Sequence, residues 1–394
     1  MDFFKDKQKK RQFINSYGTF LLNGMLSLSI GSLLPYIRDA RGLEYAFCGL
    51  IVSLHSVGNL VASFASGALP ALIGRKRSIL LFNAAYAVSY LLIIFDGNNL
   101  CIALAFFMTG LARGATSNCG NTTVNQLAPG QAWILNGLHA MFSVGAFLFP
   151  LILTVLAGNG GENWIYVCYF MLAMGVISWL LYLGIPMEQS AAAKGKERGG
   201  GLAFFREPLF YLCTLTLFFY LCAEQGVIGW LVTYFKDTGL LDASLSQMTA
   251  SVQWAMVLTG RLLTAWLSVR APKERLMRLM GVGLVLFFGV LITGTSPVQI
   301  MIGIMGFGIS MAGIYPTTVS FSGLMMEDYP MAWSYILTMA SIGSVLMPSV
   351  IGKIADAAGI AVGMSSVGVV VVIDFVFILI LTAFVHTKGE KIEN

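Results

Sequence analysis

Apolar runs about as long as a bilayer is thick follow one another along the whole chain. A helix needs about 20 mostly apolar residues to cross a membrane, and charged or Gly/Pro-rich segments separate runs of that length here. The pattern predicts an all-α membrane protein with twelve transmembrane helices. The predicted spans lie near 13–35, 47–70, 78–96, 100–127, 133–157, 163–186, 208–235, 244–269, 276–295, 297–324, 331–357 and 361–386.

A polar segment divides these spans into two sets of six. It covers residues 188–207 and carries a cluster of basic residues and a run of three glycines, a composition typical of a flexible linker. We therefore expect three parts in the chain. They are an N-terminal six-helix bundle at 1–187, a cytoplasmic linker at 188–207 and a C-terminal six-helix bundle at 208–394.

The two sets of six align with each other at a shift of 198 residues. The segment Ile30-Gly31-x4-Tyr36-x-Arg38-Asp39 recurs as Ile228-Gly229-x4-Tyr234-x-Lys236-Asp237. The same shift pairs Gly110 with Gly308, Gly145 with Gly343, and Pro150 with Pro348. Separate segments that agree on one gap-free shift indicate a head-to-tail duplication. Same-sense membrane repeats are typical of one class of transporter, whose site lies between the halves.

Basic residues predict which side of the membrane each loop faces, because Lys and Arg are enriched in cytoplasmic loops. If the amino terminus is inside, the inner loops and tails hold 18 of the 24 basic residues, and the outer segments hold four. We therefore expect a multi-pass protein of the cytoplasmic (inner) membrane with both termini in the cytoplasm. The net charge of +5 predicts no nucleic-acid binding, since the basic residues lie in short loops rather than one stripe.

Composition narrows the class of protein further. Hydrophobic residues make up 57% of the chain and charged residues only 11%, whereas about a quarter of the residues of a soluble protein are charged. The sequence shows no nucleophile–base set, no metal-ligand spacing and no phosphate-binding loop. It therefore predicts no enzyme activity, no cofactor and no metal site.

The loop after the second span matches much of a family motif, Gly-x3-Asp-Arg-x-Gly-Arg-Lys. Together with the twelve predicted spans and their two duplicated sets of six, this match makes the whole chain resemble the major facilitator superfamily. That resemblance implies two pseudo-symmetric bundles of the major facilitator fold that work by alternating access. The chain has Ala71 and Leu72 in place of the acidic–basic pair, so the family's latch between halves is not carried over. The matching residues are Gly67, Gly74, Arg75 and Lys76.

Within that superfamily the chain is most similar to the fucose–galactose–glucose:proton symporter branch. The resemblance implies a sugar substrate and symport with protons. Where that branch has an acid in span 4, this chain has Asn121, and span 1 has no acidic residue. Proton coupling through those two carboxylates is therefore not carried over. The similar stretches are Leu135-Asn136-Gly137-Leu138-His139-Ala140-Met141-Phe142 and Ala223-Glu224-x4-Gly229-Trp230-x3-Tyr234.

Four charged residues lie inside predicted spans, where a charge costs about 2.5–3.5 kcal/mol on insertion scales. They are Arg113, Glu224, Arg261 and Asp374, and their equivalents in the other half are uncharged. Because the duplicate lacks them, we assign them to coupling or gating, together with His139 near the cytoplasmic start of span 5. For His139, as for His55 of the second span, a role in helix packing is the alternative. For Asp374 a structural role or a hydrogen bond between helices is favoured over substrate contact, and for Arg261 gating or lipid-phosphate contact is favoured over ligand binding.

Arg113 and Glu224 are predicted at similar depth in opposite halves. We expect them to form a pair that is made or broken during transport, with Glu224 as the best candidate for proton coupling. Two alternatives stay open. Arg113 could be satisfied inside its own half, and Glu224 could stay ionised and bind a sugar hydroxyl or a structural arginine.

Span 4 carries a polar stripe at helical spacing. Its neutral amides both donate and accept hydrogen bonds, which suits a hydroxyl-rich ligand, so we assign Asn118, Asn121, Thr122 and Asn125 to substrate binding. Further side chains on spans 7 and 8 could add stacking and hydrogen bonds, although core packing is the alternative for each aromatic residue. These are Gln225, Trp230, Tyr234, Gln253 and Trp254.

The sequence thus predicts a monomeric secondary transporter in the lipid bilayer that moves a small hydroxylated solute, a sugar in the first place, with proton co-transport open. The direction of transport is not predicted. Efflux of amphiphilic drugs or lipids by the same fold is an alternative, which a cavity lined by Phe and Met would favour. A non-transporting membrane receptor is a second alternative, but the short tails and linker leave little room for a soluble appendage.

Overall fold

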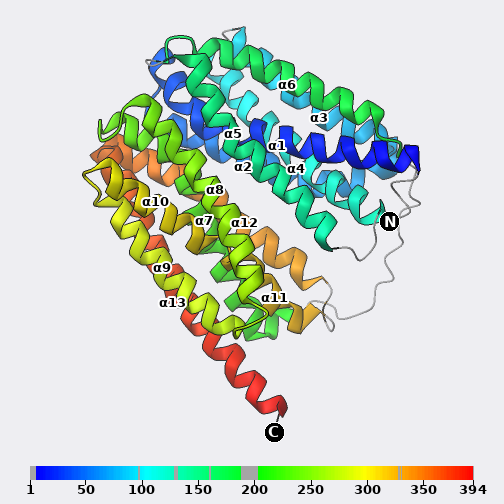
Figure 1. Cartoon of the computed structure of the whole chain (residues 1–394), viewed down its shortest axis with the longest axis vertical. Helices are drawn as coiled ribbons and strands as arrows, with labels where there is room; N and C mark the ends of the chain where they lie inside the picture. Colours follow the sequence, from blue (N-terminus) through cyan, green and yellow to red (C-terminus); the bar gives the residue numbers. More distant parts are fainter. Residues whose placement is uncertain are drawn as a thin grey trace. The chain divides into compact units, whose positions relative to one another are not determined.

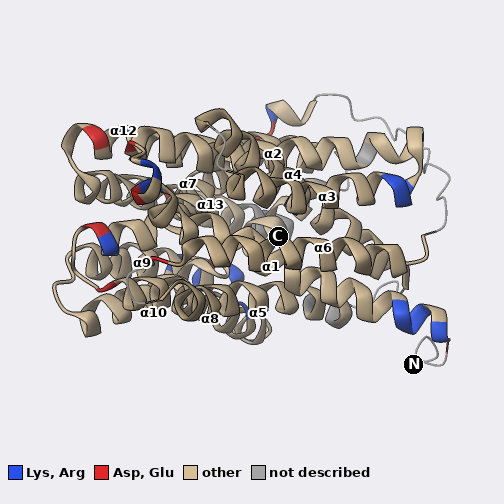
Figure 2. Cartoon of the chain, turned by 90° about the horizontal axis from the view of Figure 1, so that it is seen from above, with Lys and Arg blue, Asp and Glu red and all other residues tan. Residues whose placement is uncertain are grey.

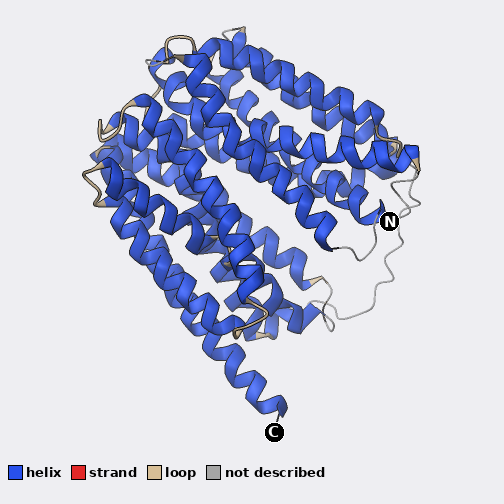
Figure 3. Cartoon of the chain, in the orientation of Figure 1, coloured by secondary structure: helices blue, strands red, loops and turns tan. Residues whose placement is uncertain are grey.

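The protein is built from α-helices (Figure 1). The structure is a computed structural model that describes residues 6–95, 98–127, 132–158, 161–187, 203–326, 329 and 331–393. Within these ranges no strand occurs (Figure 3). The helices are α1 (Lys7–Arg41), α2 (Tyr45–Ile73), α3 (Arg75–Ile94), α4 (Asn99–Leu127), α5 (Ala132–Ala157), α6 (Trp164–Gly184), the short 3-10 helix η2 (Ala203–Arg206), α7 (Pro208–Asp237), α8 (Ala243–Leu267), α9 (Lys273–Ile292), α10 (Pro297–Met311), α11 (Ile314–Met326), α12 (Ala332–Ala358) and α13 (Ile360–Glu393).

The helices correspond to the predicted spans, with α10 and α11 sharing the tenth. In the described part of the chain, eleven spans are long and apolar enough to cross a membrane. The predicted span that does not reach this threshold is α8. Its first half is rich in hydroxyl and amide side chains, which lower its hydropathy, and these side chains are buried in the protein. They are Ser246, Gln247, Thr249, Ser251 and Gln253.

The span predicted at 297–324 is interrupted, because α10 ends at Met311 and α11 begins at Ile314. Pro316 explains the break, since it lacks the backbone N–H that would bond to the carbonyl of Ala312 in a continuous helix. The regular pattern resumes one residue later, where Thr317 N donates to Gly313 O at 3.1 Å.

The chain divides into two compact units. Unit 1 comprises residues 1–43, 50–194 and 243–251, and unit 2 comprises residues 44–49, 195–242 and 252–394. Most of the linker predicted at 188–207 lies outside the described residues, and the predicted domain boundaries stay a prediction.

The same helix pairs pack in both units under the 198-residue shift. In unit 1, α1 packs on α5 and α6, and α3 packs on α4 and α6. In unit 2, α7 packs on α12 and α13, and α9 packs on α10 and α13. The close contacts repeat as well, because a Cβ on Gly145 would lie 1.9 Å from Leu21 O and a Cβ on Gly343 would lie 2.4 Å from Phe218 O. The duplication seen in the sequence is therefore a duplication of packing.

Buried hydrogen bonds join the helices of unit 1. Tyr86 of α3 donates to Asn23 Oδ1 of α1 at 2.5 Å, and Asn23 Nδ2 donates to Ser117 of α4 at 3.1 Å. Asn83 of α3 donates to Thr116 of α4 and to Ser178 of α6, both at 3.1 Å. Such bonds hold helices together where lipid provides no hydrophobic driving force between them.

Lys76 joins the start of α3 to the end of α6. Its ammonium group donates to the carbonyls of Leu183 at 2.9 Å and Ile185 at 2.6 Å, and also to the carbonyl of Tyr182. The last carbonyls of a helix have no partner within the helix, and a cation at this end is also favoured by the helix dipole. Lys76 of the loop motif is therefore a cap for α6.

The first turn of α2 belongs to unit 2 and is capped by a side chain of that same unit. Asp356 of α12 accepts from Tyr45 N at 2.8 Å and from Ala46 N at 2.7 Å. The hydroxyl of Tyr45 in turn donates to Asp237 Oδ2 at the end of α7, at 3.0 Å. A carboxylate in this position satisfies two backbone N–H groups that the helix itself leaves unpaired.

Replacing Lys76 by methionine should lower the free energy of unfolding by roughly 1–2 kcal/mol, because the carbonyls of α6 lose a charged donor. Thermal unfolding of the purified protein in detergent measures the change. Arg77→Met is the matched control, because Arg77 is the exposed neighbour of Lys76. Equal melting temperatures for the two variants would contradict the cap.

Replacing Asp356 by alanine should lower the free energy of unfolding by about 1 kcal/mol, as expected for the loss of a helix N-cap. Lys353→Ala serves as the control, since Lys353 is exposed one turn earlier on α12. Hydrogen exchange at the amides of Tyr45 and Ala46 tests the local effect. Exchange that stays as slow as in the control would rule out the capping role.

Candidate functional site

Charged residues lie mainly near helix ends, and long uncharged stretches separate them along the helices (Figure 2). The charges inside the helices are therefore the exceptions that a candidate site has to explain. Each unit holds its own set of these residues, and each unit is described by itself.

The polar stripe of α4 lines a cavity in unit 1 over part of its length. Asn118 and Thr122 face this cavity of about 210 Å³, which α2, α3 and α4 enclose. Arg75 and Ser66 also contribute to the cavity wall, and Ser66 Oγ is buried without a hydrogen-bond partner among the described residues. The remaining lining residues are Pro70, Ala71, Ser78, Ile79, Phe82, Ala115 and Cys119.

The other two members of the stripe differ in their surroundings. Asn121 is half-buried, and its Oδ1 atom has no hydrogen-bond partner within the described part of the chain. Asn125 is exposed, as is Thr122, whose hydroxyl donates to Asn118 O at 2.8 Å. The stripe therefore holds hydrogen-bonding capacity that a solute could use.

Arg113 lies beside a histidine of α2. Its Nη1 atom is 3.5 Å from His55 Nε2, and its guanidinium carbon lies 5.8 Å from the centroid of the Phe142 ring. Arg113 belongs to unit 1 and Glu224 to unit 2, so the predicted pairing of the two stays a prediction.

Glu224 is part of a polar and aromatic cluster in unit 2. Tyr220, one turn earlier on α7, donates to Glu224 Oε1 at 3.0 Å. The ring of Tyr220 lies 6.2 Å from that of Tyr315 on α11, and Tyr315 meets Trp333 of α12 edge-on at 6.5 Å. Arg261 and Glu224 both act electrostatically on Tyr220 and Tyr315. Arg261 thus lies with the coupling candidate Glu224.

The remaining residues assigned to substrate binding on α7 and α8 are buried. Trp230 is completely buried, and its indole nitrogen donates to Pro348 O at 3.1 Å. Gln253 Nε2 lies 3.8 Å from Met311 Sδ. Both side chains therefore have partners within unit 2, and a substrate role for them stays a prediction. The others with little exposure are Gln225, Tyr234 and Trp254.

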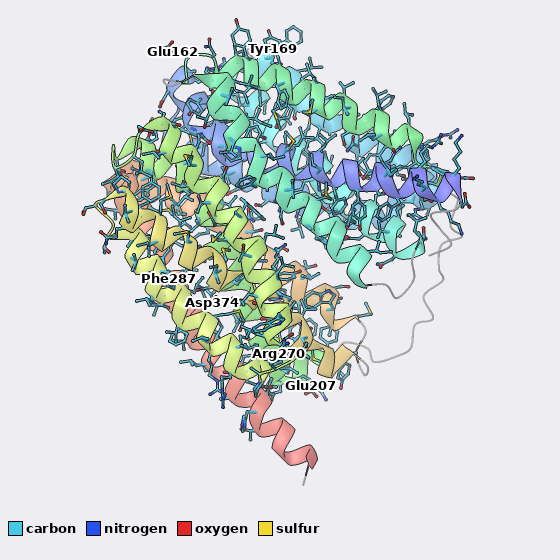
Figure 4. All side chains as sticks on the ribbon, viewed as in Figure 1. Glu162, Tyr169, Glu207, Arg270, Phe287 and Asp374 are labelled. Atoms are coloured by element: carbon cyan, nitrogen blue, oxygen red, sulfur yellow. The ribbon has the colours of Figure 1, made fainter. Side chains whose placement is uncertain are left out.

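Asp374 lies among the helices of unit 2 (Figure 4) and is completely buried. Neither of its carboxyl oxygens has a hydrogen-bond partner among the described residues, so the hydrogen bond between helices considered for it is not seen there. Cys222 of α7 is close enough to interact with it electrostatically. His139, in unit 1, presents its ring edge-on to Phe20 at 5.7 Å.

The loop motif forms the turn between α2 and α3. Gly74 has φ of 85°, a conformation that favours glycine, and Gly67 lies in α2. Arg75 donates to Gln126 Oε1 at the end of α4, at 2.7 Å. Arg75 and Gln126 also border a second cavity, of about 390 Å³, between the start of α1 and the ends of α4 and α6.

Several residues of these sites were missed from the sequence. Tyr220, Tyr315 and Trp333 are ordinary aromatic residues of apolar helices, and no spacing distinguishes them. His55 was not assigned to a site either, although a histidine inside a predicted span is a usable signal. Among the described residues, no group of three or more His, Cys, Asp or Glu side chains could hold a metal ion.

Curated relatives match nearly the whole chain at low identity. A protein of Yersinia enterocolitica named Protein TsgA homolog is 22% identical over 386 residues, which are 95% of this chain and 96% of the relative. A protein of the same name from Erwinia tasmaniensis is 23% identical and covers 93% of both chains.

Solved transporter structures share the fold. A bacterial homologue of the human lysosomal transporter Spinster, in an inward-facing and occupied conformation, superposes with a TM-score of 0.77 at 15% identity and covers 96% of this chain and 97% of its own. The nucleoside transporter NupG superposes with a TM-score of 0.72 at 17% identity, covering 96% and 99%. These matches confirm the predicted all-α membrane fold of about twelve helices.

The family profile described as Major Facilitator Superfamily matches residues 16–326. That match covers well over half of the 394 residues, and it includes the first set of helices and the second set as far as α11. The chain therefore belongs to the Major Facilitator Superfamily, and it is a multi-pass membrane transporter rather than an enzyme.

Proposed function

We propose that this transporter moves a small hydroxylated solute, with a monosaccharide as the first candidate, by alternating access. The observation that carries the proposal is the stripe of neutral amides on α4. Asn121 offers a buried Oδ1 atom without a partner among the described residues, and Asn125 is exposed. Amide groups accept and donate hydrogen bonds at once, which matches the chemistry of a sugar hydroxyl.

The cluster around Glu224 supports the same class of solute. It combines a carboxylate that accepts hydrogen bonds with the half-buried rings of Tyr315 and Trp333. An apolar ring face beside a few fixed polar groups is a common composition for a small-molecule site. The similarity to a nucleoside transporter adds nucleosides to the candidates, since they too carry hydroxyl groups.

Glu224 is the proposed site of proton coupling. A carboxyl inside a membrane protein is a functional candidate by default, and this one lies half-buried beside Tyr220 and near Arg261. A protonated Glu224 would be neutral, and an ionised Glu224 would be attracted to the arginine. The two forms therefore favour different local arrangements, which is the requirement for coupling.

Two finer features complete the proposal. The bias of Lys and Arg between loops supports a location in the cytoplasmic membrane with both termini in the cytoplasm. The stretches on the fifth and seventh spans support a place near the fucose–galactose–glucose:proton symporter branch. The absence of that branch's span 4 carboxylate argues for a different proton site, for which Glu224 is the candidate.

Counterflow in proteoliposomes should detect the substrate class. Vesicles loaded with one unlabelled solute are diluted into its tracer, with a panel of monosaccharides and nucleosides and with tetraphenylphosphonium as the amphiphilic comparison. We expect tracer uptake for at least one hydroxylated solute. Uptake of tetraphenylphosphonium alone would instead support the efflux of amphiphiles.

Glu224→Gln should keep the exchange of solute across the membrane but abolish its coupling to protons. Counterflow requires no net proton movement, so the variant should exchange solute within about threefold of the unaltered protein if the glutamine keeps the bond from Tyr220. A 1:1 proton symporter can accumulate its solute about tenfold for each pH unit of the gradient. The variant should lose this accumulation.

Glu207→Gln is the control for this measurement. Glu207 immediately precedes α7, before the candidate span Pro208–Asp237 begins. It lies near one end of the helices of unit 2 (Figure 4). It should keep both activities. If Glu224→Gln still accumulates solute against a gradient, Glu224 is not the coupling residue.

A further inference from the structure

The contact between Arg113 and His55 suggests a role for His55, a residue that the proposed function does not use. His55 is only 3% exposed, and Arg113 is half-buried. Their side chains meet through Arg113 Nη1 and His55 Nε2, 3.5 Å apart. A guanidinium group donates hydrogen bonds only, so the contact is a bond only if Nε2 carries a lone pair.

The surroundings of the ring determine where its proton lies. Thr109 Oγ1 donates its single hydrogen to Phe106 O at 2.7 Å. The same oxygen is 2.9 Å from His55 Nδ1. Because the hydroxyl hydrogen is directed at Phe106 O, we assign this oxygen as the acceptor and place the hydrogen of the ring on Nδ1. A neutral imidazole with hydrogen on Nδ1 has its lone pair on Nε2. His55 is thereby prepared as an acceptor for Arg113.

Backbone packing keeps the two residues in place. A Cβ on Gly110 would lie 1.9 Å from His55 O, and a Cβ on Gly58 would lie 2.1 Å from Phe107 O. The backbones of α2 and α4 therefore touch on both sides of His55. Arg113 follows Gly110 by one helical turn, which brings its side chain to the imidazole.

The equivalent helix pair in unit 2 shows that this packing does not need a charged residue. The 198-residue shift converts His55 to Gln253 and Arg113 to Met311, and these two side chains are also in contact, with Gln253 Nε2 3.8 Å from Met311 Sδ. Gly308, the equivalent of Gly110, would likewise place a Cβ 3.0 Å from Gln253 O. The helix crossing is thus built without any charge in unit 2.

We propose that His55 is a positioning residue for Arg113, and that the pair serves transport rather than the packing of α2 on α4. The imidazole orients the guanidinium without adding a negative charge of its own, whereas a carboxylate in its place would neutralise the arginine. The counterflow measurements that test this proposal rest on the proposed function, and the thermal unfolding measurements do not.

Three substitutions of His55 separate orientation from packing. In His55→Gln the longer side chain reaches the Nε2 position and can turn its amide oxygen toward Arg113 as an acceptor, and glutamine is the residue that unit 2 has at the equivalent position 253. In His55→Asn the amide reaches only the Nδ1 position, and His55→Leu has no polar atom. We expect His55→Gln to keep the rate of solute counterflow, and the other two to lower it about tenfold, the size of one lost bond to a charged group.

The double variant His55→Gln/Arg113→Met transfers the natural pair of unit 2 into unit 1. It should fold with a melting temperature close to that of the unaltered protein but lose counterflow about tenfold or more. Counterflow at the unaltered rate in this variant would overturn the proposal. Equal rates for His55→Gln and His55→Asn would overturn it as well.

If no solute of the panel is exchanged, that result rejects only the proposed substrate class. Thermal unfolding in detergent still tests whether Arg113 and His55 interact. His55→Leu should melt lower than His55→Leu/Arg113→Met, because removing the arginine also removes the need for an acceptor. Additive shifts of the two single substitutions would show that the side chains do not interact and would overturn the proposal.

Discussion

Polar groups inside a membrane have no water to bond with, so leaving one without a partner in the protein is costly. In unit 1 this requirement joins Asn23, Tyr86 and Ser117 in one set of hydrogen bonds and Asn83 with Thr116 in another. These bonds add direction to packing contacts that lipid alone would not favour. The helix ends meet the same requirement through charged side chains, with Lys76 on the carbonyls of α6 and Asp356 on the amides of α2.

The duplication separates the requirements of the fold from those of function. Equivalent glycines bring equivalent backbones together in both units, so close packing belongs to the shared scaffold. The charged residues do not repeat. Arg113 corresponds to Met311 and Glu224 to Leu26, and a buried charge costs several kcal/mol that an apolar residue does not. Retaining such a residue in only one half is difficult to explain by stability.

The candidate site is consistent with a transporter that holds its solute weakly and through neutral groups. The contacts proposed on α4 are amides and hydroxyls, which avoid the desolvation cost of full charges, and this suits a solute that has to be released again. The carboxylate and arginine of unit 2 lie beside aromatic rings, where a change of protonation alters local attraction. Binding and coupling can therefore be carried by different side chains of the same protein.

The amino-acid sequence by itself predicted the helical membrane fold, the spans and the duplication, because length, apolarity and the 198-residue shift are properties read along one dimension. It also identified the charged residues inside the spans, since each is unusual in its own span. Only the tertiary structure brought Tyr315 close to Glu224 and Arg261, packed Trp333 against Tyr315 and set His55 against Arg113. Those neighbours lie on different helices, and the rotation and crossing of helices depend on side-chain packing in three dimensions, which no pattern within a single span contains.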